Sequence, residues 1–154
     1  MNILVAGGSG FLGQALTQTL VDQHHHVTIL TRDPSKVAHH AHVQAKRLTD
    51  LAVHDQYDVV INLTGAGIAD ARWSDARKAE LLDSRLQTTQ ALVRWMHQVE
   101  QRPQVLLSGS AIGWYGAQGD LILTEHSQPH DEFVHQLCAA WEKAALEVQT
   151  LGIR

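Results

Sequence analysis

The stretch Gly7-Gly8-Ser9-Gly10-Phe11-Leu12-Gly13 decides the fold of this chain. An apolar run over residues 3–6 precedes it, and apolar side chains recur at helical spacing over residues 15–20, so the pattern predicts a strand, a glycine turn and a helix. In such a turn Gly7 permits the tight bend, Gly10 lets a phosphate group approach the backbone, and Gly13 lets the helix pack closely on the strand. The free N–H groups at the start of the helix attract an anion. The stretch therefore predicts a dinucleotide-binding turn formed by Gly7, Ser9, Gly10, Phe11, Leu12 and Gly13.

The context of the turn separates this hypothesis from its alternative, a flexible glycine loop that binds nothing. The three glycines stand in step as G-x-x-G-x-x-G, and a strand at the start of the chain precedes them. A second apolar run, at residues 27–31, follows the predicted helix, as the nucleotide-binding βαβ unit requires. A flexible loop would not need three glycines at this spacing, so the context favours a nucleotide.

Composition describes an ordinary globular chain of 154 residues, with 44% hydrophobic and 18% charged residues, long enough for one domain with a core. The formal net charge is −4 and no basic run stands out, so we expect a small-molecule partner and neither nucleic acid nor a membrane surface. A single cysteine, Cys138, excludes an internal disulfide, and we expect it to be packed in a helix rather than reactive. The N-terminal apolar run is only a strand long, which indicates a cytoplasmic protein.

Eleven histidines include two clusters, at residues 24–26 and at His39, His40 and His42. Metal binding is one interpretation of these clusters. Residues 24–26 fall at a helix-to-strand turn where consecutive side chains point in different directions, and no Cys or carboxylate cluster completes a site. The sequence therefore predicts a solvated turn and no metal site.

Periodicity and turn residues predict an alternation of strands and helices along the chain. The strands are expected at residues 2–6, 26–31, 43–48, 58–64 and 105–107, and the helices at 11–23, from 34, at 75–99 and at 131–150. Right-handed crossovers turn this order into an α/β fold of the Rossmann type, a doubly wound parallel sheet whose ligand lies beyond the carboxyl ends of the strands.

The last residues, Leu151-Gly152-Ile153-Arg154, come where another strand would begin. We therefore expect residues 1–154 to form an incomplete NAD(P)-binding Rossmann domain, truncated before the last strands and without a C-terminal substrate-binding part. Such a chain exposes an apolar sheet edge near residues 105–107 and one face of the final helix. This exposure predicts self-association into a dimer or a larger homo-oligomer.

The residue at the end of the second strand indicates which dinucleotide binds. NAD-binding folds place an acidic residue there for the ribose hydroxyls, whereas an arginine suits the 2′-phosphate of NADP. Here the residue is Arg32, and the competing Asp33 precedes Pro34 as a helix N-cap. The sequence favours NADP(H) over NAD(H), the alternative being that Arg32 is an exposed loop arginine without a ligand.

Five blocks of the chain resemble, in order, those of a known family: "GGSGFLG" at 7–13, "VTILTR" at 27–32, "VVINLTGAGIADARWSDARKAELLDSR" at 59–85, "LLSGSAIGWYG" at 106–116 and "LTEHSQP" at 123–129. They resemble the atypical or extended short-chain dehydrogenase/reductases of the NAD-dependent epimerase/dehydratase type. The likeness points to a branch of this family that resembles the bacterial cell-division inhibitor-like proteins. Members of that branch are about twice this long, which implies that the substrate-binding half is absent here.

The resemblance implies roles for residues at two strand ends. Asn62, Leu63, Thr64 and Gly65 match the strand that lines the adenine and ribose of the cofactor. Ser110 matches the serine that polarises a reacting oxygen, although its hydroxyl could instead satisfy the local backbone.

The family's catalytic tyrosine and lysine, Y-x-x-x-K, are missing. Phe133 or Val134 occupies the place of the tyrosine, and Leu137 or Cys138 that of the lysine. Tyr115 is the only nearby phenol, and without a cation its pKa near ~10 makes it a poor base at neutral pH.

Three functions fit these residues. The first is an NADP(H)-binding epimerase or oxidoreductase of unknown substrate that uses Ser110 and Tyr115. The second is a nucleotide-binding sensor or regulatory module without catalysis, which the missing Y-x-x-x-K favours. The third is an inactive truncated fragment.

Overall fold

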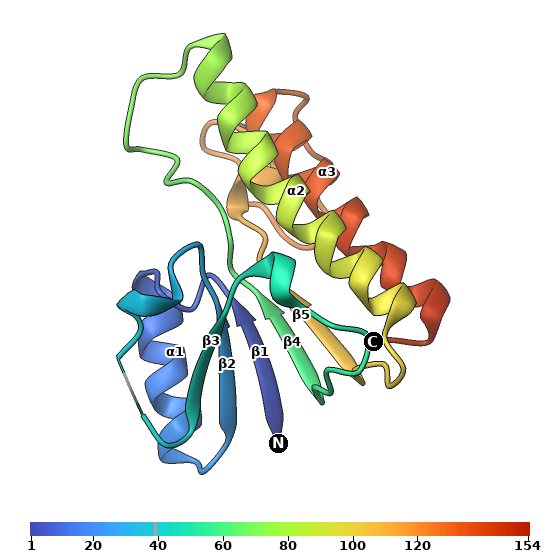
Figure 1. Ribbon diagram of the computed structural model, residues 1–154. Helices are drawn as coiled ribbons and strands as arrows, with labels where there is room; N and C mark the ends of the chain where they lie inside the picture. Colours follow the sequence, from blue (N-terminus) through green and yellow to red (C-terminus); the bar gives the residue numbers. More distant parts are fainter. Residues whose placement is uncertain (39) are drawn as a thin grey trace.

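The computed structural model of the chain describes residues 1–38 and 40–154 and contains one parallel sheet with helices on both faces (Figure 1). The strand order is β3-β2-β1-β4-β5, which confirms the predicted doubly wound sheet. The strands are β1 (Asn2–Ala6), β2 (His26–Leu30), β3 (Val43–Lys46), β4 (Val59–Asn62) and β5 (Val105–Ser108). Several end earlier than predicted, because the chain leaves the sheet there to form loops.

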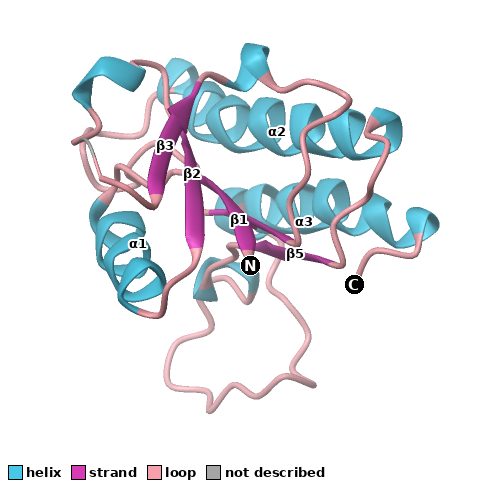
Figure 2. Ribbon diagram, turned by 60° about the horizontal axis from the view of Figure 1, so that its bottom comes forward, coloured by secondary structure: helices cyan, strands magenta, loops and turns pink. Residues whose placement is uncertain are grey.

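The helices are α1 (Phe11–Asp22), α2 (Asp75–Gln98) and α3 (Phe133–Leu146). α2 and α3 lie side by side on one face of the sheet, and α1 covers the other face (Figures 1 and 2). The helix predicted from residue 34 is only a 3₁₀ turn, η1 (Pro34–Lys36). The helix predicted for 131–150 is divided into α3 and a 3₁₀ segment, η4 (Glu147–Leu151).

β1 is buried on both faces, which explains its unbroken apolar sequence. Ile3 and Val5 contact the layer that contains α1, whereas Leu4 and Ala6 contact the layer that contains α2. All four side chains are at most 2% exposed. Burying each larger aliphatic side chain contributes about 1.5–3 kcal/mol, so the central strand holds the two layers together.

The chain end lies beside β5. The Arg154 N–H donates to the Gln104 carbonyl (3.1 Å), and the Arg154 carbonyl accepts from the Leu106 N–H (2.8 Å). These two bonds have the pattern of a parallel pairing, so Arg154 continues the sheet in the place where the sequence analysis expected another strand.

A buried polar cluster joins the sheet to both helices of the α2 face. Thr89, on α2, is 1% exposed, and its hydroxyl accepts from the Asn62 side-chain amide (2.8 Å) and from the Trp141 indole N–H (3.0 Å). The same hydroxyl donates to the Arg85 carbonyl (2.7 Å). Asn62 Oδ1 in turn accepts from the backbone N–H and the hydroxyl of Thr64. The cluster therefore fixes the loop that follows β4.

α1 ends in a turn that uses a histidine where glycine is favoured. His24 has φ +62°, in the left-handed region. The His25 N–H donates to the Leu20 carbonyl (3.0 Å) and the His24 N–H to the Val21 carbonyl (2.9 Å), which is the Schellman pattern of helix termination. The helix-to-strand turn predicted for residues 24–26 is thus confirmed at His24 and His25, whereas His26 is the first residue of β2.

This turn gives a first prediction. His24→Gly should raise the free energy of unfolding by about 1 kcal/mol, because glycine adopts the left-handed conformation without the Cβ clash. Urea denaturation followed by circular dichroism measures the change. The matched variant His25→Gly, at a position without positive φ, should lower stability, and equal effects of the two variants would contradict the explanation.

The Thr89 cluster gives a second prediction. Thr89→Val should lower the free energy of unfolding by about 2–4 kcal/mol, because it leaves two buried donors, on Asn62 and Trp141, without their acceptor. Thr19→Val is the control, since Thr19 also donates to a carbonyl four residues earlier (3.0 Å) but is exposed. The control should change stability by less than about 0.5 kcal/mol. If both variants lost the same free energy of unfolding, the loss in Thr89→Val would not come from the two unpaired donors.

Candidate functional site

A cleft of about 1100 Å³ lies at the carboxyl ends of β1, β2 and β4. β1 is the strand at which the chain order reverses, since β2 and β4 are its two neighbours. Such a switch point is where open α/β sheets bind their ligands. The residues that line the cleft come from the loops after β1, β2, β3 and β4 and from the first half of α2.

The glycine turn forms one wall of this cleft, and each glycine has its own steric reason. Gly7 has φ +83°, and a Cβ there would lie 2.8 Å from the Leu63 carbonyl carbon. A Cβ on Gly13 would lie 2.1 Å from the Gly7 oxygen, so only glycine lets α1 pack against the turn. Gly10 is the N-cap of α1, and a Cβ there would meet the Gly7 oxygen at 3.3 Å and otherwise open space. Gly10 therefore keeps free the space in front of the helix N-terminus.

The structure places the predicted cofactor residues at three positions relative to the cleft. Seven line it: Gly7, Ser9, Gly10, Arg32, Leu63, Thr64 and Gly65. Phe11 and Leu12 lie on the first turn of α1, where their side chains are 92% and 67% exposed. Gly13 and Asn62 are buried behind the wall, where they fix its shape. The contact of each residue with a cofactor stays a prediction.

Arg32 is exposed on the rim of the cleft, and its neighbour Asp33 lies on the same rim. The Asp33 carboxylate accepts from the hydroxyl (2.6 Å) and the backbone N–H (3.3 Å) of Ser35, which confirms the predicted N-cap. The hydrogen bonds from Ser35 lower the pKa of Asp33, and its charge also pairs with Lys36 (3.4 Å). The carboxylate is thus engaged within its own turn.

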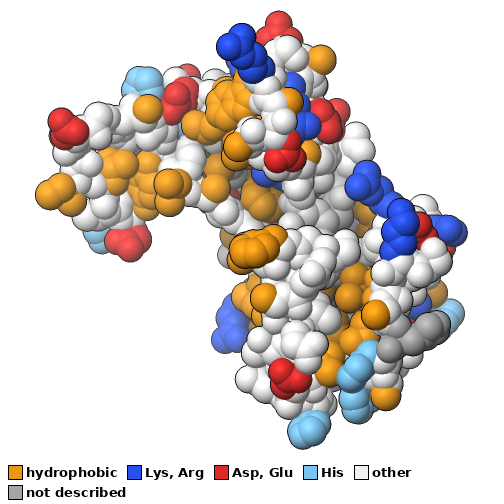
Figure 3. All heavy atoms as spheres, turned by 90° about the vertical axis from the view of Figure 1, so that its left-hand side faces the viewer, with side chains coloured by type: hydrophobic (Ala, Val, Ile, Leu, Met, Phe, Trp, Pro, Cys, Tyr) orange, Lys and Arg blue, Asp and Glu red, His pale blue; other side chains and the backbone are white. Residues whose placement is uncertain are grey.

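Arg47 is a second rim cation, which the sequence analysis missed. It is the first residue after β3, Arg32 is the second residue after β2, and the parallel register pairs the last residues of the two strands, Leu30 and Lys46. The Arg47 side chain donates to the Arg32 carbonyl (3.5 Å). In Figure 3 Lys and Arg side chains gather beside a hollow in the face shown. Arg47 fell inside the strand predicted at 43–48, so its position after a strand end became visible only once β3 was seen to end at Lys46.

The loop after β4 is held against α2 by two side chains. Ser84 accepts from the Ala66 N–H (3.0 Å), and the Arg85 guanidinium donates to the Ala66 carbonyl (3.2 Å). A Cβ on Gly65 would lie 2.8 Å from the Arg85 guanidinium carbon, so a side chain there would displace the guanidinium. Burial lowers the pKa of Arg85 from its usual value, and the guanidinium lies over the Trp141 ring (5.3 Å). This wall of the cleft is therefore fixed before any ligand binds.

The two predicted catalytic residues lie beyond β5, outside the lining of the cleft. Ser110 is exposed and donates a hydrogen bond to the Glu142 carboxylate of α3. Tyr115 is half-buried and packs edge-to-face against Trp114 (5.1 Å between ring centres). Their catalytic roles stay predictions.

Two residues of the segment that lacks Y-x-x-x-K, Leu137 and Cys138, are packed in the core. Leu137 and Cys138 are each 2% exposed and pack with Leu81 of α2. Burial raises the pKa of the Cys138 thiol, which agrees with the predicted packing role. Across residues 1–38 and 40–154, no helix is both long and apolar enough to span a membrane.

Comparisons with known proteins give a family match over nearly the whole chain. The model of the NAD dependent epimerase/dehydratase family matches residues 3–150. The epimerase family protein YfhF of Bacillus subtilis is 36% identical, over 100% of this chain and 52% of that protein. The epimerase family protein SDR39U1 of Bos taurus is 35% identical, over 94% of this chain and 49% of that protein. The chain thus spans about half the length of the curated relatives it matches.

Solved structures agree with this match. The human epimerase family protein SDR39U1 (isoform 2), solved with NADPH, superposes with a TM-score of 0.81 and 31% identity, over 94% of this chain and 48% of that chain. A nucleoside-diphosphate sugar epimerase from Corynebacterium glutamicum gives a TM-score of 0.78 and 29% identity, over 100% of this chain and 32% of that chain. The family match, the two relatives and the shared fold agree with the resemblance in the sequence blocks: this chain belongs to the NAD-dependent epimerase/dehydratase family.

Proposed function

We propose that this chain binds NADPH in the cleft at the carboxyl ends of β1, β2 and β4. It would thereby form the cofactor-binding part of an epimerase-family oxidoreductase whose substrate is a small molecule. The pair of guanidinium groups on the rim, Arg32 and Arg47, carries the proposal, because Asp33 is engaged in its own turn. That the related human protein was solved with NADPH supports it.

The chemistry of the rim suits the 2′-phosphate that distinguishes NADPH from NADH. Arginine presents a planar fork of N–H donors that matches phosphate oxygens, and a hydrogen bond to a charged group contributes about 1.5–3 kcal/mol. Arg32 and Arg47 come from neighbouring strand ends, so both can reach one phosphate group. A carboxylate free at this rim would instead favour the ribose hydroxyls of NADH.

The rest of the cleft suits the remaining parts of the cofactor. Gly10 leaves open space before the N-terminus of α1, where N–H groups and the helix dipole attract a pyrophosphate. The segment from Leu63 to Gly65 supplies the opposite wall. When bound, the nicotinamide would supply the hydride acceptor or donor. The chain's own contribution is to bind and orient the cofactor.

A second function is favoured by one observation. Leu137 and Cys138 are buried where the superfamily's lysine would reach the cofactor, so the usual acid–base pair is missing. A nucleotide-binding sensor or regulatory module needs the cleft but not that pair. We place either function in the cytoplasm, which the single, buried cysteine supports.

Arginine substitutions test the proposal. Arg32→Ala and Arg47→Ala should each weaken NADPH binding about tenfold to a hundredfold and leave NADH binding nearly unchanged. Isothermal titration calorimetry with both dinucleotides measures this difference. Arg94→Ala, which removes an exposed arginine of α2, is the matched control and should change neither affinity. Equal losses for NADPH and NADH in the rim variants would refute a 2′-phosphate site.

Glycine substitutions test the pyrophosphate site. Gly10→Val should abolish dinucleotide binding in a folded protein, because its side chain fills the open space before α1. Gly13→Ala should instead destabilise the fold, since its Cβ would lie 2.1 Å from the Gly7 oxygen. Circular dichroism and calorimetry separate the two effects. A Gly10→Val protein with native affinity would place the phosphates elsewhere.

A further inference from the structure

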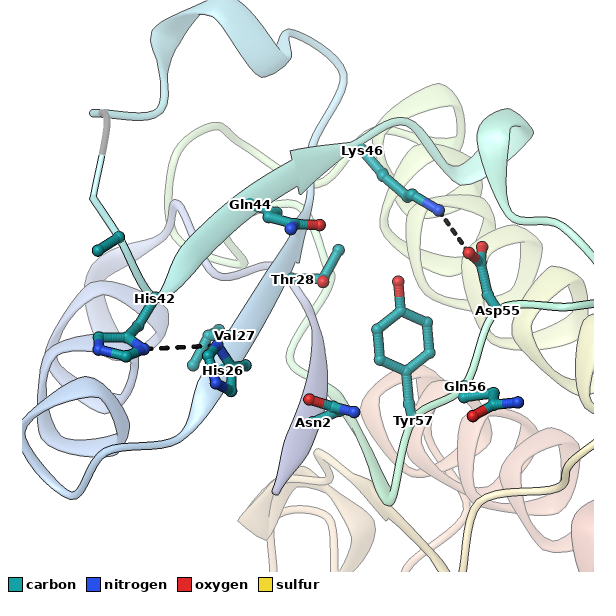
Figure 4. A pocket seen from close by; sticks show the side chains of 11 residues that line it. Asn2, His26, Val27, Thr28, His42, Gln44, Lys46, Asp55, Gln56 and Tyr57 are labelled. Atoms are coloured by element: carbon teal, nitrogen blue, oxygen red, sulfur yellow. Dashed lines mark hydrogen bonds and ion pairs between the residues drawn. The ribbon is translucent and has the colours of Figure 1, made fainter.

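Two histidines that are far apart in the sequence meet at the starts of β2 and β3. The parallel register pairs Val27 with Val43, so the preceding residues, His26 and His42, lie side by side. Figure 4 shows the two rings facing one another at one end of a cavity of about 350 Å³, and the Val27 N–H donates to the His42 carbonyl (2.8 Å). The ring centres are 4.8 Å apart, and the two Nδ1 atoms are separated by 3.4 Å.

This separation is the one that a single metal ion requires. Zinc binds histidine nitrogen at about 2.0–2.1 Å in tetrahedral geometry, which places two nitrogen ligands about 3.3–3.4 Å apart. The two histidines of the chain therefore need no rearrangement of their nitrogens to share one ion. Because the residues flank a hydrogen-bonded pair of strands, the backbone holds the two histidines side by side.

The two Nδ1 atoms hydrogen-bond to each other (3.4 Å), and a bound ion would take the place of the proton between them. The Nδ1 atom of His40 accepts from the His42 backbone N–H (3.2 Å), which holds the segment that enters β3. Lys46, the cation in the lining of the cavity, is paired with Asp55 (2.6 Å). His26 is exposed, so an ion can reach the pair from solvent, and Figure 3 shows histidines on the molecular surface.

We propose that His26 and His42 bind one divalent transition-metal ion, such as Zn²⁺, Ni²⁺ or Cu²⁺, through their Nδ1 atoms. Within residues 1–38 and 40–154 no group of three or more His, Cys, Asp or Glu side chains is arranged to hold a metal, so water completes the coordination. Imidazole ligands suit these ions, whereas Mg²⁺ and Ca²⁺ prefer oxygen. The proposal departs from the expectation of no metal site, which considered the two histidine clusters separately and not as neighbours across the sheet.

A bound ion would tie the starts of β2 and β3 together. Arg32 follows the other end of β2, and the chain comes back to the sheet at His42, just before β3. Because the pair exists only in the folded chain, ion binding must stabilise the fold. The stabilisation gives a readout that does not depend on any enzymatic activity.

Titration of the untagged chain with ZnCl₂ and NiCl₂ tests the proposal. We expect one ion per chain, a higher melting temperature with either metal, and no effect of MgCl₂. His26→Ala and His42→Ala should each lower the affinity about tenfold or more, because each removes one of two protein ligands. His97→Ala and His126→Ala, which remove exposed histidines elsewhere, are the controls and should retain the affinity.

Two outcomes would overturn the proposal: no binding by the native chain, or full affinity in the double variant His26→Ala/His42→Ala. Circular dichroism of each variant confirms that it is folded. Imidazole nitrogen NMR adds an independent measurement, since metal on Nδ1 requires the proton on Nε2. Adding metal should therefore shift the proton to Nε2 in the native chain and in the controls. If the single variants lack this shift, the ion is bound by His26 and His42.

Discussion

The arrangement of the cleft depends on the hydroxyl of Thr89. This one group accepts from Asn62 and Trp141 and donates to the Arg85 carbonyl, so its hydrogen-bonding capacity is used in full. It links the end of β4 to α2 and α3, at a point where no water is available to replace a lost partner. Because Asn62 then holds both groups of Thr64, the loop that forms a wall of the cleft inherits its shape from the core. A binding site built this way is preorganised, which reduces the ordering cost of binding.

Most of the fold follows from local patterns in the sequence. Continuous apolar runs such as residues 3–6 identify strands that are buried on both faces. These strands alternate with helices along the chain, and right-handed crossovers then produce a doubly wound parallel sheet. Boundaries were less predictable, because they depend on tertiary contacts. Residues 34–36 form only one 3₁₀ turn, because the backbone is already extended at Val37 (φ −83°, ψ 126°). The left-handed conformation of His24 was also hidden, because the Schellman turn normally uses glycine.

Residues of the candidate cofactor cleft could be predicted where a single stretch of sequence contains both the strand and the residues that follow it. The turn at residues 7–13 carries its strand, glycines and helix together, and Arg32 follows a recognisable strand. Arg47 escaped because β3 is short and weakly apolar, so its end was misplaced by two residues. Asn62 was assigned to the wall of the cofactor site, yet its side chain is fully buried behind that wall. Sequence position indicates the strand end correctly but not the direction in which a side chain points.

Local charge, rather than net charge, decides what the cleft attracts. The chain carries a formal net charge of −4, yet Arg32, Lys36 and Arg47 all line the same rim. Exposed charges farther away than about 8 Å are largely screened at physiological ionic strength, so the acidic residues elsewhere oppose a bound phosphate only weakly. Of the two acidic residues that line the cleft, Asp33 is held by Ser35 and Lys36, and Glu80 is paired with Arg77 (2.6 Å). A negative net charge is therefore compatible with a phosphate-binding rim, because the electrostatic potential at a site is set by the groups that surround it.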